Sequence, residues 1–171
     1  MKNVRRGRIK EYAETHKGVT YYENKSVWDL IGEQSIKVDL AFPSAHENEI
    51  DSKNAETLVK NGCYCISEGA NMPSTMDAIE VYREHKALFA PAKAANAGGV
   101  ATSGLEMSQN SLRMSWTRDE VEQRLHGIMK SIHRNCLEAA SAYGSPGDYV
   151  NGANIAGFLK VANAMLAYGI V

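Results

Sequence analysis

The chain has 171 residues, of which 44% are hydrophobic and 23% charged, with 14 Gly and only 4 Pro. Such a composition is typical of one globular domain, or one domain and part of another, and it excludes a disordered, collagen-like or disulfide-scaffold protein. A formal charge of −1 gives no electrostatic reason to expect a nucleic acid or an acidic membrane as partner. No apolar run reaches the roughly 20 residues of a membrane helix, and no apolar stretch follows the charged residues 1–10 as it would in a secretory signal.

The first third of the chain alternates short elements. Charged residues with apolar positions on one face predict a helix over residues 3–16, and a short strand is predicted over 19–23. A turn or helical piece surrounds Trp28 at residues 27–31. The mostly apolar run IKVDLAF, residues 36–42, stops at a proline and predicts a buried strand.

The middle of the chain repeats a strand and helix pattern. A helix is predicted over 51–61, a buried strand over 63–67, a helix from the turn and cap residues 73–75 to about His85, and a third short strand over 87–90. Helices between short apolar strands predict right-handed crossovers and a parallel sheet, so we expect the α/β class.

The pattern becomes all helical after residue 101. Thr117 and Glu120 have the spacing of a capping box, which predicts the start of a long amphipathic helix toward Tyr143. A final helix is predicted over 154–168. A Gly-rich phosphate turn of the GxGxxG kind is absent from the sequence. The sheet is therefore either a small α/β domain or the second half of a dinucleotide-binding domain.

Three loops follow the carboxyl ends of the predicted strands, at residues 43–48, 68–73 and 91–100. Ligands bind beyond these ends in open parallel sheets. Each loop has small residues and an asparagine, and the Gly98 and Gly99 pair opens a helix whose free N–H groups suit an anion. An asparagine in a loop is commonly a turn residue, and that alternative applies to each loop taken alone.

Metal ligands are not predicted. Cys63 and Cys65 share one face of a strand, where thiols pack as small hydrophobes, and Cys136 is distant in the chain. His126 and His133 are seven residues apart on one helix, a spacing that favours surface or interface positions over a metal pair. Three unpaired thiols suit a reducing compartment.

Two further residue types have both a chemical and a structural interpretation. Glu68 is a candidate acid or base, but a helix-capping or loop-fixing role is favoured. Trp28 and Trp116 are interpreted as packing residues and not as stacking platforms.

Three runs resemble one enzyme family: EGANMP at 68–73, KAANAGGVATSGLEMSQN at 93–110 and GANIAGFLKVANAML at 152–166. They are similar to the C-terminal part of hexameric, NADP-dependent glutamate dehydrogenases, and the resemblance extends along essentially the whole chain. It implies the second half of a Rossmann-type parallel sheet followed by C-terminal helices. Residues 1–100 would be a partial NADP-binding domain, and residues 101–171 a helical segment that packs back toward an N-terminal domain.

The resemblance also implies how NADP is bound. Asn71 would lie at the nicotinamide ribose and Asn96 at the nicotinamide and substrate end of the cleft. Ser44 and Ala45 would follow the strand beside the adenosine and pyrophosphate half. The basic residues near the start would approach the 2′-phosphate, although a solvated helix face is an equal alternative for them. These basic residues are Lys2, Arg5 and Arg8.

The substrate side follows from the same resemblance. Val100 would line the pocket for the substrate side chain, and the Ser103 hydroxyl would hydrogen-bond the side-chain carboxylate of L-glutamate or 2-oxoglutarate. The alternative for Ser103 is a hydrogen bond to a carbonyl one turn back in its helix. The implied enzyme is a cytoplasmic homo-hexamer of amino-acid metabolism and nitrogen assimilation that releases ammonia from glutamate in a reversible oxidative deamination.

Two departures from the family pattern limit this expectation. The family loop usually reads Ala-Thr-Gln-Asn, whereas here Ala45 is followed by His46, Glu47 and Asn48, which puts an acid near an anionic coenzyme. The family's catalytic lysine and acid/base aspartate belong to an N-terminal domain, so no catalytic residue is expected in this chain. We expect a fragment that is inactive alone; the alternative is a non-catalytic remnant acting as a nucleotide-binding or subunit-assembly module.

Overall fold

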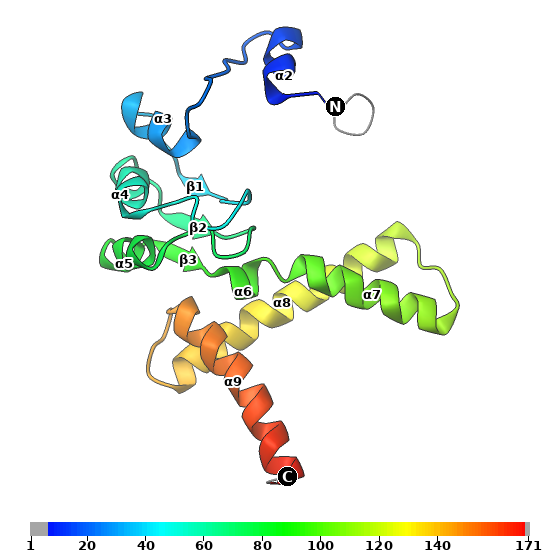
Figure 1. Ribbon diagram of the computed structural model, residues 1–171. Helices are drawn as coiled ribbons and strands as arrows, with labels where there is room; N and C mark the ends of the chain where they lie inside the picture. The colour runs from blue at the N-terminus through cyan, green and yellow to red at the C-terminus, as the bar shows by residue number, and fades with distance from the viewer. Residues whose placement is uncertain (1–6, 170–171) are drawn as a thin grey trace.

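A computed structural model describes residues 7–169 of the chain (Figure 1). Within those residues, no helix combines the length and apolar character that crossing a membrane requires. The elements in chain order are α2 (Ile9–Thr15), α3 (Val27–Glu33), β1 (Leu40–Ala41), α4 (Ser52–Lys60), β2 (Cys65–Ser67), α5 (Met76–Glu84), β3 (Leu88–Ala90), α6 (Ala92–Ala95), α7 (Gly98–Leu112), α8 (Arg118–Ala142) and α9 (Tyr149–Tyr168).

The three strands form one parallel sheet in the order β1-β2-β3. Ala41 pairs with Ile66, and Ile66 pairs with Phe89. Helices α4 and α5 make the two connections between successive strands, as short apolar strands separated by helices predicted. The α/β class and the parallel sheet are confirmed.

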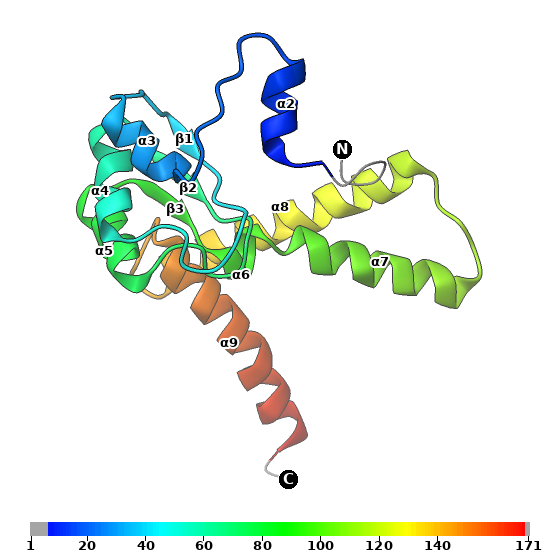
Figure 2. The same cartoon turned by 45° about the horizontal axis from the view of Figure 1, so that its top comes forward.

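The core lies between the sheet and the helices α3, α4 and α5, which gather on one side of the strands (Figures 1 and 2). Ile66 and Phe89 are buried against Leu58 of α4 and Tyr82 of α5, whereas Leu88 on the other face of β3 is exposed. Burial raises the pKa of Tyr82 to about 12. The alternation of buried and exposed side chains along β3 follows from the two-residue period of a strand.

Side chains cap the N-terminal starts of helices α4, α5 and α8. The Asp51 carboxylate accepts the Asn54 N–H at 2.8 Å, and the Thr75 hydroxyl accepts the Ala78 N–H at 3.3 Å. Thr117 accepts from Glu120, whose carboxylate accepts the Thr117 N–H in return at 2.7 Å, so the predicted capping box is present. Each bond satisfies a backbone donor that the first turn of a helix leaves free.

Two strand predictions were wrong or too long. Residues 19–23 form no strand but an irregular connection between α2 and α3, because no partner strand lies beside them in the described part of the chain. The run 36–42 forms a strand only at Leu40 and Ala41, which pair with Cys65 and Ile66 of β2. Before it, the Val38 N–H donates to Asn61 O at the end of α4.

Helix α9 crosses α8 closely and is also fixed to α5. Gly152 is buried, and a Cβ atom added there would lie 2.1 Å from the Cys136 backbone oxygen. Asp148, the N-cap of α9, accepts a hydrogen bond of 2.7 Å from Arg83 on α5. Burial acts to raise the pKa of Asp148, but hydrogen bonds from the Asn151 N–H and from Arg83 hold it below its ordinary value.

Replacing Gly152 by Ala should destabilise the protein, although Ala favours a helix interior. The added methyl group forces α8 and α9 apart, and overpacking of this kind costs roughly 1–3 kcal/mol. The control is Gly157→Ala in the same helix, where an added Cβ meets no atom within 4 Å. That change should stabilise by roughly 0.5–1 kcal/mol. Chemical denaturation measures both; a gain in stability for both variants would contradict the close crossing.

Candidate functional site

The three predicted loops meet at the carboxyl edge of the sheet. The N–H groups of Gly69 and Ala70 both donate to the carbonyl oxygen of Pro43, at 2.9 and 3.2 Å, and the Asn48 N–H donates to Met72 O at 3.0 Å. These bonds join the loop after β1 to the loop after β2. The pairing agrees with the expectation that consecutive parallel strands present their loops at one edge.

Glu68, directly after β2, joins the second loop to the third. Its side chain is only 3% exposed. One carboxylate oxygen, Oε1, accepts the Ser74 N–H at 3.1 Å, and Oε2 accepts the Ala92 N–H at 2.8 Å. The start of α6 and the residue before the N-cap of α5 are therefore held on one buried side chain. Each carboxylate oxygen of Glu68 thus accepts one backbone N–H group, which is the loop-fixing role that the sequence favoured.

Asn71 and Asn96 place amide groups at this edge. The Asn96 Nδ2 group donates to the Ala70 carbonyl at 3.0 Å, and the Asn71 Nδ2 group donates to Glu47 Oε1 at 3.1 Å. Within residues 7–169, neither Oδ1 atom accepts a hydrogen bond. Each side chain thus has an acceptor oxygen that is available to a hydroxyl or amide of a ligand.

Ser44 and Ala45 lie in the loop after β1 and are occupied by local contacts. The Ser44 hydroxyl donates to Phe42 O at 3.0 Å, and Gly69 stands so close that an added Cβ would lie 2.3 Å from Ser44 Oγ. The Ala45 N–H donates to Glu49 Oε1 at 2.9 Å, and Glu49 Oε2 accepts from Trp28 Nε1 at 3.2 Å. Trp28 packs against the core, as predicted.

The third predicted loop, residues 91–100, is largely helical, because α6 lies within it and α7 already begins at Gly98. Helix α7 carries Val100 and Ser103. The two residues are one turn apart, and the Val100 side chain is 73% exposed. The Ser103 hydroxyl points back to Gly99 O at 3.4 Å, which is long for a hydroxyl donor. The Ser103 side chain is therefore compatible with both predictions, a hydrogen bond to the substrate and a hydrogen bond to Gly99 O in its own helix.

Of the basic residues predicted for the 2′-phosphate, the structure describes only Arg8. Lys2 and Arg5 lie outside the described residues, and Arg8 stands at the N-cap of α2. That helix lies apart from the sheet in both views (Figures 1 and 2). The assignment of Arg8 to the coenzyme remains a prediction.

Histidines and cysteines form no metal site in the part of the chain that the structure describes. His126 and His133 are exposed, and His133 Nδ1 lies 2.9 Å from the Tyr149 hydroxyl. Burial raises the pKa of Cys63 and of Cys136, which keeps both thiols protonated at neutral pH. The buried thiols of Cys63 and Cys136 therefore act as small apolar side chains. Cys63 precedes β2 and Cys65 is its first residue, so the two do not share one strand face as predicted.

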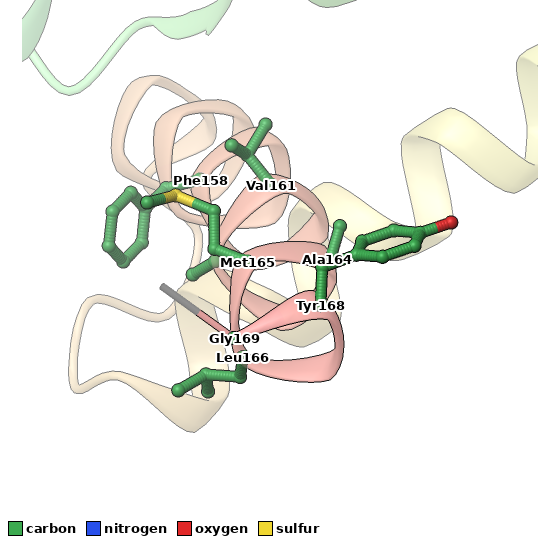
Figure 3. Close-up of a pocket in the computed structure, with 8 residues that line it drawn as sticks. Phe158, Val161, Ala164, Met165, Leu166, Tyr168 and Gly169 are labelled. Atoms are coloured by element: carbon green, nitrogen blue, oxygen red, sulfur yellow. The ribbon is translucent and has the colours of Figure 1, made fainter. Parts of the chain in front are cut away.

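Two features had no counterpart among the residues predicted to form the site. One is the contact of Glu47 with Asn71, which joins residues 24 positions apart and has no local signal. The other is an exposed apolar surface on α9, where Phe158, Val161 and Met165 project from the helix (Figure 3). Residues 161–168, which are apolar apart from Asn163 and include no charged residue, could have indicated it.

Replacing Glu68 by Gln should loosen the loop edge. Glutamine has one acceptor oxygen, so its NH₂ group would face either the Ser74 or the Ala92 N–H, and one buried backbone donor would lose its partner. The expected loss in unfolding free energy is roughly 1–3 kcal/mol. Glu84→Gln, at an exposed position, is the matched control and should change stability by less than about 0.5 kcal/mol. Equal stability of the two variants in denaturant titrations would show that Glu68 does not fix the loops.

Comparison with known proteins gives one consistent family. A family model described as Glutamate/Leucine/Phenylalanine/Valine dehydrogenase matches residues 1–169. An NAD(P)-specific glutamate dehydrogenase of Xylanibacter ruminicola is 55% identical over 170 residues, which are 99% of this chain and 37% of that protein. An NADP-specific glutamate dehydrogenase of Haemophilus influenzae is 50% identical over 171 residues, covering 99% of this chain and 36% of that protein.

The fold agrees with the same family. The crystal structure of Plasmodium falciparum glutamate dehydrogenase superposes with a TM-score of 0.92 at 45% identity, and the match covers 100% of this chain and 36% of that one. The chain thus spans slightly more than a third of the length of the proteins it matches. The α/β architecture described above is that of the corresponding part of these enzymes.

Proposed function

The chain belongs to the glutamate/leucine/phenylalanine/valine dehydrogenase family, and we propose that it forms the nicotinamide side of the coenzyme cleft of an NADP-dependent glutamate dehydrogenase. The observation that carries this proposal is the pair of amides, Asn71 and Asn96, held at the carboxyl edge of the sheet with their Oδ1 atoms available. The whole enzyme would interconvert L-glutamate with 2-oxoglutarate and ammonia, as a cytoplasmic homo-hexamer.

The chemistry of the loops fits the nicotinamide nucleoside better than the phosphates of NADP. Neutral amides pair with ribose hydroxyls and with a carboxamide. Lys93 is the one Lys or Arg in the three loops, and its Nζ group donates to Asn154 Oδ1 on α9. In this proposal Asn71 binds the ribose, Asn96 orients the nicotinamide end, and phosphate contacts come from outside these loops. The bound coenzyme supplies the hydride acceptor, while these residues position it.

In this arrangement Asn96 also holds two of the loops together. Its amide donates to Ala70 O in the neighbouring loop, so the third loop is held against the second while the Oδ1 atom stays available. Because Glu68 fixes the same two loops from beneath, the spacing between Asn71 and Asn96 is set before a ligand arrives. Such preorganisation reduces the entropy that binding must remove.

Val100 and Ser103 would form the substrate side of the same edge. Val100 offers an apolar wall, and the Ser103 hydroxyl would donate to the side-chain carboxylate of glutamate. The long 3.4 Å contact to Gly99 O makes this donor easy to redirect toward a carboxylate, which forms the stronger hydrogen bond. The 2′-phosphate of NADP would be met by Lys2 and Arg8.

A hybrid enzyme tests the proposal. The corresponding segment of the Haemophilus influenzae relative is replaced by this chain, and reductive amination of 2-oxoglutarate with NADPH is followed by absorbance. The hybrid should be active, because the three loops supply the same coenzyme contacts. The 171-residue chain alone should give no rate, since it carries no group proposed for proton transfer. A folded hybrid without activity, beside an active unmodified relative, would contradict the proposed function.

Ser103→Ala in that hybrid tests the substrate side. Loss of one hydrogen bond to a charged group should lower kcat/KM for glutamate by about 10–100-fold, while the use of norleucine should change little or improve. Ser108→Ala is the matched control, because the Ser108 hydroxyl makes the same backward contact, to Gly104 O at 2.9 Å, in the same helix. If both variants keep the same glutamate-to-norleucine ratio, Ser103 acts only within its helix.

A further inference from the structure

Glu47 brings a carboxylate to the loop edge. It lies in the loop after β1, is exposed, and accepts the Asn71 Nδ2 group through Oε1 at 3.1 Å. In the part of the chain that the structure describes, no Lys, Arg or His nitrogen pairs with this carboxylate. The side-chain nitrogen of His46 contacts the backbone oxygen of Glu47 and not its carboxylate. Among the residues that the structure describes, the negative charge of Glu47 is therefore uncompensated at the edge where the two amides converge.

The position of that charge relative to Asn71 decides what it can do. Under the proposed function, Asn71 lies at the nicotinamide ribose, so a carboxylate bonded to Asn71 stands at the nicotinamide end of the cleft. The nicotinamide ring is cationic in the oxidised coenzyme and neutral in the reduced one. A carboxylate near the ring attracts the first form and has no such attraction for the second. Its repulsion of the coenzyme phosphates is common to both forms and cancels in the comparison.

We propose that Glu47 is a specificity-determining residue that makes the site prefer oxidised over reduced nicotinamide coenzyme. This inference rests on the proposed function, and it concerns the redox form that is bound and not the reaction. Glu47 acts through its charge, while its hydrogen bond to Asn71 holds that charge at the nicotinamide end. Glu49, two residues on, does not share this role, because Ala45 and Trp28 occupy both of its oxygens and fix it to the core side of the loop.

Glutamine is the informative replacement at position 47. Its side chain has the same length as glutamate and keeps an oxygen that can accept from Asn71, so the contact between the loops can persist while the charge is removed. Glu47→Asp keeps the charge on a shorter side chain. Glu84→Gln removes one charge from the end of α5, at the opposite edge of the sheet, and controls for the net charge of the protein.

The experiment measures dissociation constants of NADP⁺ and NADPH by titration calorimetry at low ionic strength, for the hybrid enzyme in which this chain replaces the corresponding segment of the Haemophilus influenzae relative. The quantity of interest is the ratio of the NADPH constant to the NADP⁺ constant. In Glu47→Gln this ratio should fall by about three- to tenfold, as expected for one charge acting over several ångströms of wet protein surface. It should stay within about twofold in Glu47→Asp and Glu84→Gln, and added salt should lower it in the unmodified chain.

The possible outcomes separate the inference from the proposed function. If Glu47→Gln changes both constants by the same factor, or neither, the charge does not select the redox form and the inference is wrong, while the proposed function stands. If the hybrid enzyme with the unmodified chain binds neither coenzyme, the proposed function of these loops is contradicted and the inference falls with it. A fall in the ratio confined to Glu47→Gln supports both.

Discussion

The buried carboxylate of Glu68 and the two backbone N–H groups that it accepts are the contact on which the loop edge depends. One side chain fixes Ser74, next to the N-cap of α5, and Ala92, at the start of α6, to the end of β2. Asn71 lies between the end of β2 and Ser74, and Asn96 lies one turn beyond Ala92. A carboxylate can do this because each of its two oxygens accepts one donor, whereas glutamine has a single acceptor oxygen and an aliphatic residue has none.

The environment of this carboxylate explains why it can be buried without a cation. Both of its oxygens meet backbone donors at the starts of segments, where N–H groups lack partners within a helix. The same logic recurs at Asp51 and Thr75, whose side chains cap α4 and α5. The backbone N–H groups that lack partners at the starts of these helices are thus accepted by side chains along one edge of the sheet. The edge is rigid before any ligand binds, which suits a site that must hold a coenzyme in one orientation.

Structural features that depend on neighbouring residues could be predicted from the sequence, whereas those that depend on contacts between distant segments could not. The capping box at Thr117 and Glu120 and the ends of α4 and α5 follow from neighbouring residues, and the parallel sheet follows from their order. The strand expected at 19–23 failed because strand propensity has no effect without a partner, which only the tertiary structure supplies. The contact of Glu47 with Asn71 spans 24 residues and required the folded loops. The roles of Val100 and Ser103 rest on resemblance, because an exposed helix face does not itself define a ligand.

The way in which α9 is attached gives it a graded local stability along its length. Its first two turns are tied to three other helices, through Arg83 to α5, through Lys93 to the start of α6, and through the close approach of Gly152 to α8. Its last turns, from Phe158 onward, project away from the body in both views and are largely exposed (Figures 1 and 2). Amide hydrogens should therefore exchange slowly in the first turns, where opening requires the packed body to open, and much faster toward Tyr168, where the helix frays by itself.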